Sequence, residues 1–333
     1  MNGSVFLVSE KIITLFLILF AGIIARKTNI IDWASTKKLS AFLLNITQPL
    51  MIITSFQMDY DSEKIKNGLS LFAISIVIHI FLAAASFMIY KPVRDGGKRK
   101  IYEMATIFCN CAFLGYPVLK VIFGDELGVF YGAFYAMFFN IFIWTYGVYL
   151  MMRKDKIVGD GVLDVPKNTN QIKFPIRKIF INAGMIASVT GIIIFMFGIK
   201  LPGIIYDSAK LVGDMTFPLS MIIIGSLISD IKLKDMFLSI KNYYYIFVKL
   251  IFIPGFIALA CYLLKLPPLL IYMGTIMNSM PSAANVAIFA ETYGADSKAG
   301  AINVGLSTLF SIGTIPLMIY FLENILNLKT LVS

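Results

Sequence analysis

Long apolar runs separated by short polar segments dominate the chain. Each run holds about 20 mostly apolar residues, the length that an α-helix needs to cross a bilayer. None shows the alternation of polar and apolar positions that is typical of a membrane-spanning β-strand. The pattern therefore predicts an all-α integral membrane protein with ten transmembrane helices, at about 5–25, 38–57, 69–90, 101–123, 128–150, 176–198, 204–228, 243–264, 269–291 and 299–322.

The longest polar connection, at about 151–175, divides these spans into five and five. An odd number of spans in each half requires the two halves to insert with opposite orientations. We therefore expect two inverted repeats, 1–150 and 176–333, joined by the linker 151–175. Lys and Arg residues cluster in this linker and in the other loops on its side of the membrane. The positive-inside rule places that side in the cytoplasm, with both termini extracytoplasmic.

Short similar segments recur between the two halves at nearly the same spacing. Thr47 and Pro49 of the second span recur 169 residues later as Thr216 and Pro218 of the seventh span. Weaker matches relate the fourth span to the ninth and the fifth to the tenth. This recurrence supports an inverted repeat. Each of these prolines can also be a simple helix kink, because proline is frequent in membrane helices.

The ninth span carries an unusual polar stretch, Asn278-Ser-Met-Pro-Ser-Ala-Ala-Asn285, in the middle of an apolar run. Pro281 lacks a backbone donor and clashes with the preceding helical turn. Amide and hydroxyl groups of Asn278, Ser282 and Asn285 are placed at membrane depth. A broken helix survives there only where it is buried in protein or lines a wet cavity. The stretch therefore predicts a transporter substrate site made by a discontinuous helix.

The fourth span is expected to be broken in the same way. Gly115 and Pro117 weaken the helix, and Asn110 supplies an amide one to two turns earlier. The amino-terminal ends of such half-helices favour anions, and neutral amide donors avoid a permanent cation at the bilayer midplane. We expect a carboxylate to be bound by seven residues of the two segments: Asn110, Gly115, Pro117, Asn278, Pro281, Ser282 and Asn285.

Three titratable residues within the predicted spans are candidates for ion coupling or substrate attraction. Asp214 is the acidic residue that lies inside a span away from its ends, and it is a candidate proton carrier or cation ligand. The alternative is a buried carboxyl hydrogen-bonded to a neighbour such as Thr216. Lys120 can attract the anion or reach outward to the membrane interface. His79 can relay protons or simply pack among its apolar neighbours.

Composition supports a membrane protein and excludes several other classes. The chain is 58% hydrophobic and 14% charged, with a mean hydropathy of +0.82. The net charge of +10 lies in the loops, so topology explains it without a nucleic-acid partner. Cys109, Cys111 and Cys261 lie in apolar runs, and buried thiols explain them better than a metal site or disulfides. No catalytic or nucleotide-binding motif occurs, so we expect neither an enzyme nor a cofactor.

Two motifs resemble those of a known family. The run Asn110…Gly115-Tyr-Pro-Val-Leu-Lys120…Gly124 is similar to the fourth-helix motif of the auxin efflux carrier family, which includes plant PIN auxin exporters and bacterial permeases for malate and related acids. The run Met280-Pro…Phe-Ala-Glu-x-Tyr-Gly294 is similar to the ninth-helix motif. The short linker differs from the long loop of many plant members and favours the bacterial permease branch.

The resemblance implies a fold related to bile-acid and sodium–proton transporters. It implies that helices 4 and 9 cross at their breaks, with the substrate carboxylate near the crossing. It also implies a scaffold of helices 1, 2, 6 and 7, a moving domain of helices 3–5 and 8–10, elevator-type alternating access, and a homodimer formed through the scaffold.

Together these features predict a secondary transporter for a small organic anion in the cell membrane. Its driving force would be the anion gradient, the membrane potential, or coupling to H⁺ or Na⁺. An anion channel through the same broken helices is one alternative. A membrane sensor that binds a ligand without moving it is another.

Overall fold

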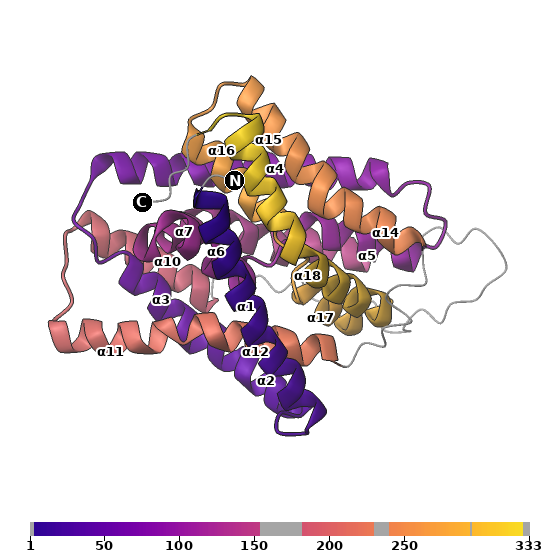
Figure 1. Cartoon of the computed structure of the whole chain (residues 1–333), viewed down its shortest axis with the longest axis horizontal. Coiled ribbons are helices and arrows are strands. Elements are labelled where there is room, and N and C mark those ends of the chain that lie inside the picture. Colours follow the sequence, from indigo (N-terminus) through magenta and orange to yellow (C-terminus); the bar gives the residue numbers. More distant parts are fainter. Residues whose placement is uncertain (1–2, 154–181, 230–239, 294, 329–333) are drawn as a thin grey trace.

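The structure is a computed structural model that describes residues 3–153, 182–229, 240–293 and 295–328 (Figure 1). In these ranges the regular secondary structure is helical, apart from a single isolated β-bridge. The predicted linker, from residue 154 onward, lies outside the described residues.

The helices follow the predicted spans one after another. In the first half they are α1 (Gly3–Lys27), α2 (Trp33–Phe42) with α3 (Gln48–Ser55), α4 (Ser62–Ile89), α5 (Gly96–Ile107) with α6 (Tyr116–Phe123), and α7 (Asp125–Phe142) with α8 (Val148–Met152). In the second half they are α10 (Ala183–Met196), α11 (Gly203–Asp214) with α12 (Thr216–Ser229), α14 (Ile240–Phe247) with α15 (Ile253–Leu263), α16 (Pro268–Ser279) with α17 (Asn285–Thr292), and α18 (Ser297–Tyr320).

Several of these helices can cross a membrane by length and composition. In the described part of the chain, five helical stretches are long and apolar enough: Ser62–Ile89, Glu126–Met152, Gly203–Ser229, Asn242–Leu263 and Ser297–Ile325. Cys111–Phe123 and Ala183–Met196 are shorter apolar helices. The prediction of an all-helical chain with membrane-spanning segments is confirmed, whereas the count of ten and the repeat topology stay predictions.

Polar residues in the loops start many of the helices. The side chains of Asp32, Asp61, Asp95, Asn182 and Asp296 each accept a hydrogen bond from a backbone N–H in the first turn of the helix that follows. Such caps satisfy amide groups that have no partner within the helix. These caps fix where the five helices begin.

Wide π-helical turns precede three of the prolines inside the spans. Leu43–Thr47, Cys111–Gly115 and Val248–Phe252 are π-helical, and each is followed two residues later by a proline. Proline lacks the N–H that would bond to the carbonyl four residues earlier, and its ring clashes with that carbonyl. A wider turn relieves this clash, so the spans continue as helices through Pro49, Pro117 and Pro254.

Glycines let α1 and α12 approach backbone to backbone. A Cβ atom built on Gly22 would lie 2.2 Å from the carbonyl oxygen of Ile222, and one on Gly225 would lie 2.0 Å from that of Leu19. Figure 1 shows α1 lying across α12, with α2 beside them. A corresponding contact joins α3 to α10. Small residues at such contacts are typical of helix pairs in membranes, where close packing drives association.

The recurring threonines of the second and seventh spans contact each other. The hydroxyl of Thr216 donates to that of Thr47 over 2.9 Å, and both side chains are fully buried. Two residues related by a two-fold axis can contact each other only when both lie next to that axis. The hydrogen bond therefore supports the sequence recurrence from which the inverted repeat was inferred.

The single histidine is packed among aromatic rings. His79 of α4 is fully buried, its Nδ1 donates to the carbonyl of Ser75 over 2.7 Å, and the rings of Tyr135 and Phe139 lie within 6 Å of it. These contacts favour packing over proton relay.

Candidate functional site

The fourth predicted span is interrupted at Phe108–Asn110. Helix α5 ends at Ile107, Phe108 has an extended backbone, and Asn110 caps the next half-helix by accepting the Phe113 N–H over 3.1 Å. The sequence predicted the interruption but placed its cause at Gly115 and Pro117. That location was wrong, because the π-helical turn Cys111–Gly115 carries the helix through to the proline.

The ninth predicted span is interrupted at Met280–Ala284, around the proline that predicted it. Helix α16 ends at Ser279, and Met280 is extended, as expected of a residue that precedes proline. Helix α17 then starts at Asn285. The prediction of a break at Pro281 is confirmed.

The two interruptions cross each other and pair through their backbones. The N–H of Asn110 donates to the carbonyl of Pro281 over 2.7 Å, and the N–H of Ala283 donates to that of Phe108 over 2.9 Å. These bonds form an antiparallel bridge between Cys109 and Ser282. Each broken segment thus supplies the hydrogen-bond partners that the other lost, as irregular backbone at membrane depth requires.

Side chains from other helices complete the crossing. The N–H of Ser282 donates to the hydroxyl of Ser307 in α18 over 3.0 Å. The Ser282 hydroxyl donates to the carbonyl of Ala105 over 2.7 Å and also bonds to the hydroxyl of Tyr245 in α14. Ser282 therefore holds the fourth, eighth, ninth and tenth spans together, a role that its sequence context did not reveal.

These bonds change which groups are available to an anion. We expected free backbone N–H groups at the start of each half-helix. The N–H groups of Asn110, Ser282 and Ala283 are instead bonded within the protein. A side chain at the crossing does offer a donor, because the Asn110 Nδ2 group is buried and has no hydrogen-bond partner.

Two predicted asparagines flank the crossing and are buried. Asn110 is 3% exposed and Asn278 is fully buried. The Asn278 amide donates to the hydroxyl of Tyr135 over 2.9 Å and to the carbonyl of Gly274 over 2.7 Å, while its Oδ1 has no partner. Buried polar atoms without partners are rare in native proteins, and each requires an explanation. The Asn110 Nδ2 group needs an acceptor, such as a carboxylate oxygen, whereas the Asn278 Oδ1 atom needs a donor, such as a hydroxyl group.

The other predicted binding residues lie around this crossing. Gly115 packs against α16, since a Cβ there would lie 3.3 Å from the Asn110 carbonyl and 3.5 Å from the Met277 sulfur. Pro117 is buried in the first turn of α6. Asn285 is the first residue of α17 and is partly exposed.

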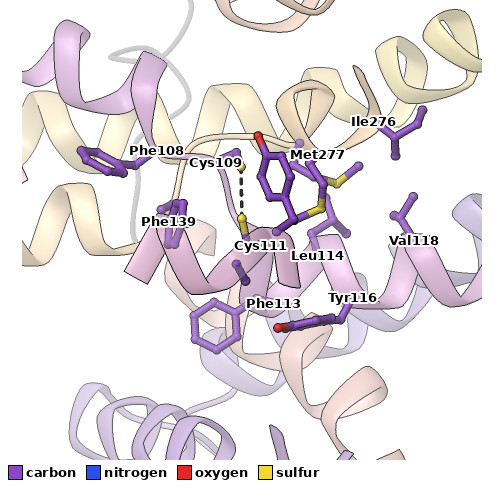
Figure 2. Close-up of a cluster of buried hydrophobic side chains, with 14 of the residues drawn as sticks. Phe108, Cys109, Cys111, Phe113, Leu114, Tyr116, Val118, Phe139, Ile276 and Met277 are labelled. Carbon is purple, nitrogen blue, oxygen red and sulfur yellow. Dashed lines mark hydrogen bonds between the residues drawn. The ribbon is translucent and has the colours of Figure 1, made fainter. Parts of the chain in front are cut away.

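Apolar side chains surround the two interruptions. Figure 2 shows Phe108, Phe113 and Leu114 of the fourth segment in one buried apolar cluster with Met277 of α16, which lies near Leu114. The sulfur atoms of Cys109 and Cys111 lie 3.2 Å apart as free thiols. Among the described residues, no cluster of three His, Cys, Asp or Glu side chains could hold a metal ion.

Two of the candidate coupling residues, Asp214 and Lys120, form an ion pair in a recess that contains no residue of the two interruptions. Asp214 ends α11, and its carboxylate lies 2.8 Å from the ammonium of Lys120 and 3.8 Å from that of Lys210. These three residues line a small recess together with Glu126. The Asp214 side chain is 47% exposed, so it is not the deeply buried carboxyl that the sequence suggested. Thr216 bonds to Thr47 and not to Asp214.

Two buried charged residues were missed by the sequence reasoning. Glu103 of α5 has a fully buried side chain that accepts hydrogen bonds from Arg99 over 2.7 Å and from Arg153 over 3.0 Å. Lys249, in the π-helical turn of the eighth span, is fully buried beside the crossing. Both stand inside predicted spans, and a charged residue at such a position is a functional candidate by default.

An all-helical chain with several bilayer-length helices, in which two interrupted segments cross, has the organisation of a multi-pass membrane transporter. Comparison with known proteins agrees. The chain belongs to the membrane transport protein family, which contains the auxin efflux carriers, and the family's sequence profile matches residues 7–319. It is also similar to the uncharacterized transporter MJ1031 of Methanocaldococcus jannaschii, with 24% identity over 321 residues, 95% of this chain and 99% of the relative. The family resemblance seen in the two motifs is thus confirmed, and both matches are to transporters.

Proposed function

We propose that the protein is a secondary transporter that moves a small organic anion with a carboxylate group, and that the carboxylate binds where the fourth and ninth segments cross. The bacterial permease branch favours a malate-like acid.

One observation carries this proposal. The Asn110 Nδ2 group is a buried donor without a partner, and it lies at a crossing where the N–H groups of Asn110, Ser282 and Ala283 are already bonded. Leaving such a group unpaired costs about 1–3 kcal/mol, and a carboxylate oxygen is the acceptor that would bond to it most strongly. The Asn110 amide is neutral, so it can donate this hydrogen bond without carrying a positive charge.

The packing supports an elevator-type mechanism on the predicted inverted-repeat plan. We assign helices 1, 2, 6 and 7 to a scaffold, and helices 3–5 and 8–10 to a domain that carries the crossing. Contacts between α1 and α12 and between α3 and α10 join scaffold helices of opposite halves. The hydrogen bonds of the crossing join helices that all belong to the moving domain, so the site would move as one unit.

The remaining assignments follow from the charge distribution of the sequence and from the family resemblance. We propose that the protein lies in the cell membrane with both termini extracytoplasmic and the linker 151–175 cytoplasmic, and that it forms a homodimer through the scaffold.

The proposal is tested by a thermal-shift screen of organic acids on the purified protein, since a ligand of the native state raises the melting temperature. We expect at least one small carboxylate to do so. Combining Asn110→Ala with Asn278→Ala should remove both the shift and the flux in proteoliposomes. Asn45→Ala is the control, because Asn45 is exposed and lies outside the crossing.

Unchanged binding and flux in the double variant would place the site elsewhere. Saturable uptake with counterflow would exclude a channel.

A further inference from the structure

Lys249 has an environment that the proposed substrate site does not explain. It lies in the π-helical turn Val248–Phe252 between α14 and α15, and no part of the residue is exposed. Its Nζ donates to the carbonyl of Thr106 over 3.1 Å and lies 3.5 Å from the carbonyl of Asn278. Both oxygens belong to the backbone of the two crossing segments.

These two carbonyls are the negative ends of two helices. Thr106 is the penultimate residue of α5, and Asn278 is the penultimate residue of α16. The last carbonyls of a helix have no partner within it, and the helix dipole adds partial negative charge there. The crossing therefore brings two carboxyl-terminal helix ends together, and the lysine side chain lies between them.

No carboxylate of the described residues forms an ion pair with this lysine. Within the described ranges, Glu103 pairs with two arginines and Asp214 pairs with two lysines, and no acidic group lies within 4 Å of Lys249. A buried ammonium is costly unless it is paired and hydrogen-bonded. Here the acceptors are helix-end carbonyls, and the ammonium in turn neutralises those ends.

Helix-end carbonyls of broken helices are also the groups that bind Na⁺ in transporters, because hard cations prefer oxygen ligands. An alkali ion and a lysine ammonium would compete for the same oxygens. We propose that the Lys249 ammonium is an internal cation that occupies an alkali-cation site between α5 and α16, so that the protein needs no Na⁺. The prediction that transport needs no Na⁺ rests on the proposed function. The prediction about ion binding does not.

The inference predicts that removing the side chain opens the cation site. The melting temperature of the purified full chain should be measured in NaCl, LiCl and choline chloride at equal ionic strength. We expect the wild-type protein to respond equally to the three salts. Lys249→Ala, which removes the charge and leaves space, should show a saturable rise with Na⁺ or Li⁺ and none with choline.

Two further variants separate the charge from the space it occupies. Lys249→Met fills the volume with an apolar chain and should show no specific response to any salt. Lys66→Ala removes an exposed lysine from α4 and should behave as the wild type.

If Lys249→Ala can be recovered folded only in Na⁺ or Li⁺, that result supports the cation site. A variant that neither salt stabilises or rescues would overturn it. A saturable Na⁺ response of the wild-type protein would overturn it too.

These measurements require no carboxylate substrate, so they remain informative if the transported ligand is of another class. In transport assays, wild-type uptake in choline medium should match uptake in Na⁺ medium within about twofold. A twofold difference is small beside the tenfold change that corresponds to about 1.4 kcal/mol.

Discussion

Substituting Asn110 by serine should separate its structural role from its binding role. The Asn110 Oδ1 atom caps the half-helix through the Phe113 N–H, and its Nδ2 atom has no partner. Serine also caps helices well, but it has no amide group to offer a ligand. Asn110→Ser therefore removes the proposed carboxylate donor and keeps the cap, whereas Asn110→Ala removes both.

The magnitudes follow from these two contacts. A hydrogen bond to a charged group contributes about 1.5–3 kcal/mol, so both variants should bind the carboxylate about 10- to 150-fold more weakly. The free energy of unfolding without ligand should distinguish them. Both variants lose the unpaired amide, but Asn110→Ala also loses the cap and should be about 1 kcal/mol less stable than Asn110→Ser. Asn110→Ser should be at least as stable as the wild type, because it removes a buried donor whose desolvation is uncompensated.

Two assays on the same preparations decide the matter. Titration calorimetry with the best acid from the thermal-shift screen gives the dissociation constant. Denaturation without ligand gives the relative stability. A dissociation constant for Asn110→Ser within about twofold of the wild-type value would mean that Asn110 is only a helix cap and that the proposed site is wrong. Such a difference is well below the tenfold that corresponds to about 1.4 kcal/mol.

Three further predictions concern groups that hold the fold together. Glu103→Ala should lower the free energy of unfolding by about 3–5 kcal/mol in chemical denaturation, because it leaves two arginines partly buried without their shared carboxylate; a loss below about 1 kcal/mol would contradict this. A double-mutant cycle on Lys120→Ala and Asp214→Ala should give a coupling free energy of no more than about 1 kcal/mol. This coupling should weaken in high salt, because the Asp214 carboxylate is half-exposed and its charge is screened. A larger coupling that does not depend on salt would contradict this and show that the pair is desolvated. Gly225→Ala should destabilise the contact of α1 with α12 by about 1–3 kcal/mol, whereas Gly313→Ala, where a Cβ meets nothing within 4 Å, should be neutral or stabilising; equal melting temperatures would argue against the close contact.

Much of the architecture could be predicted because lipid imposes simple rules on sequence. Apolar runs of bilayer length gave helices at the predicted ranges. Proline fixes its own φ and restricts the residue before it, so Pro281 located the interruption of the ninth segment. The recurrence of Thr47 as Thr216 identified two side chains that prove to be in contact.

The rest depends on tertiary contacts that leave no local signal. Phe108 and Cys109 are ordinary apolar residues, and their backbone leaves the helix because the ninth segment offers hydrogen-bond partners there. For the same reason, Gly115 and Pro117 did not locate the break. Lys249 stands out in the sequence as a charge within a span, but its partners are backbone carbonyls that only the crossing brings together.

The most direct measurement of the central claim is an experimental structure of the protein bound to the acid that stabilises it most. The account predicts that a carboxylate oxygen lies within hydrogen-bonding distance of the Asn110 Nδ2 atom, at the crossing of the two interrupted segments. A carboxylate bound instead in the recess lined by Lys120 and Lys210, with the crossing unchanged, would contradict it.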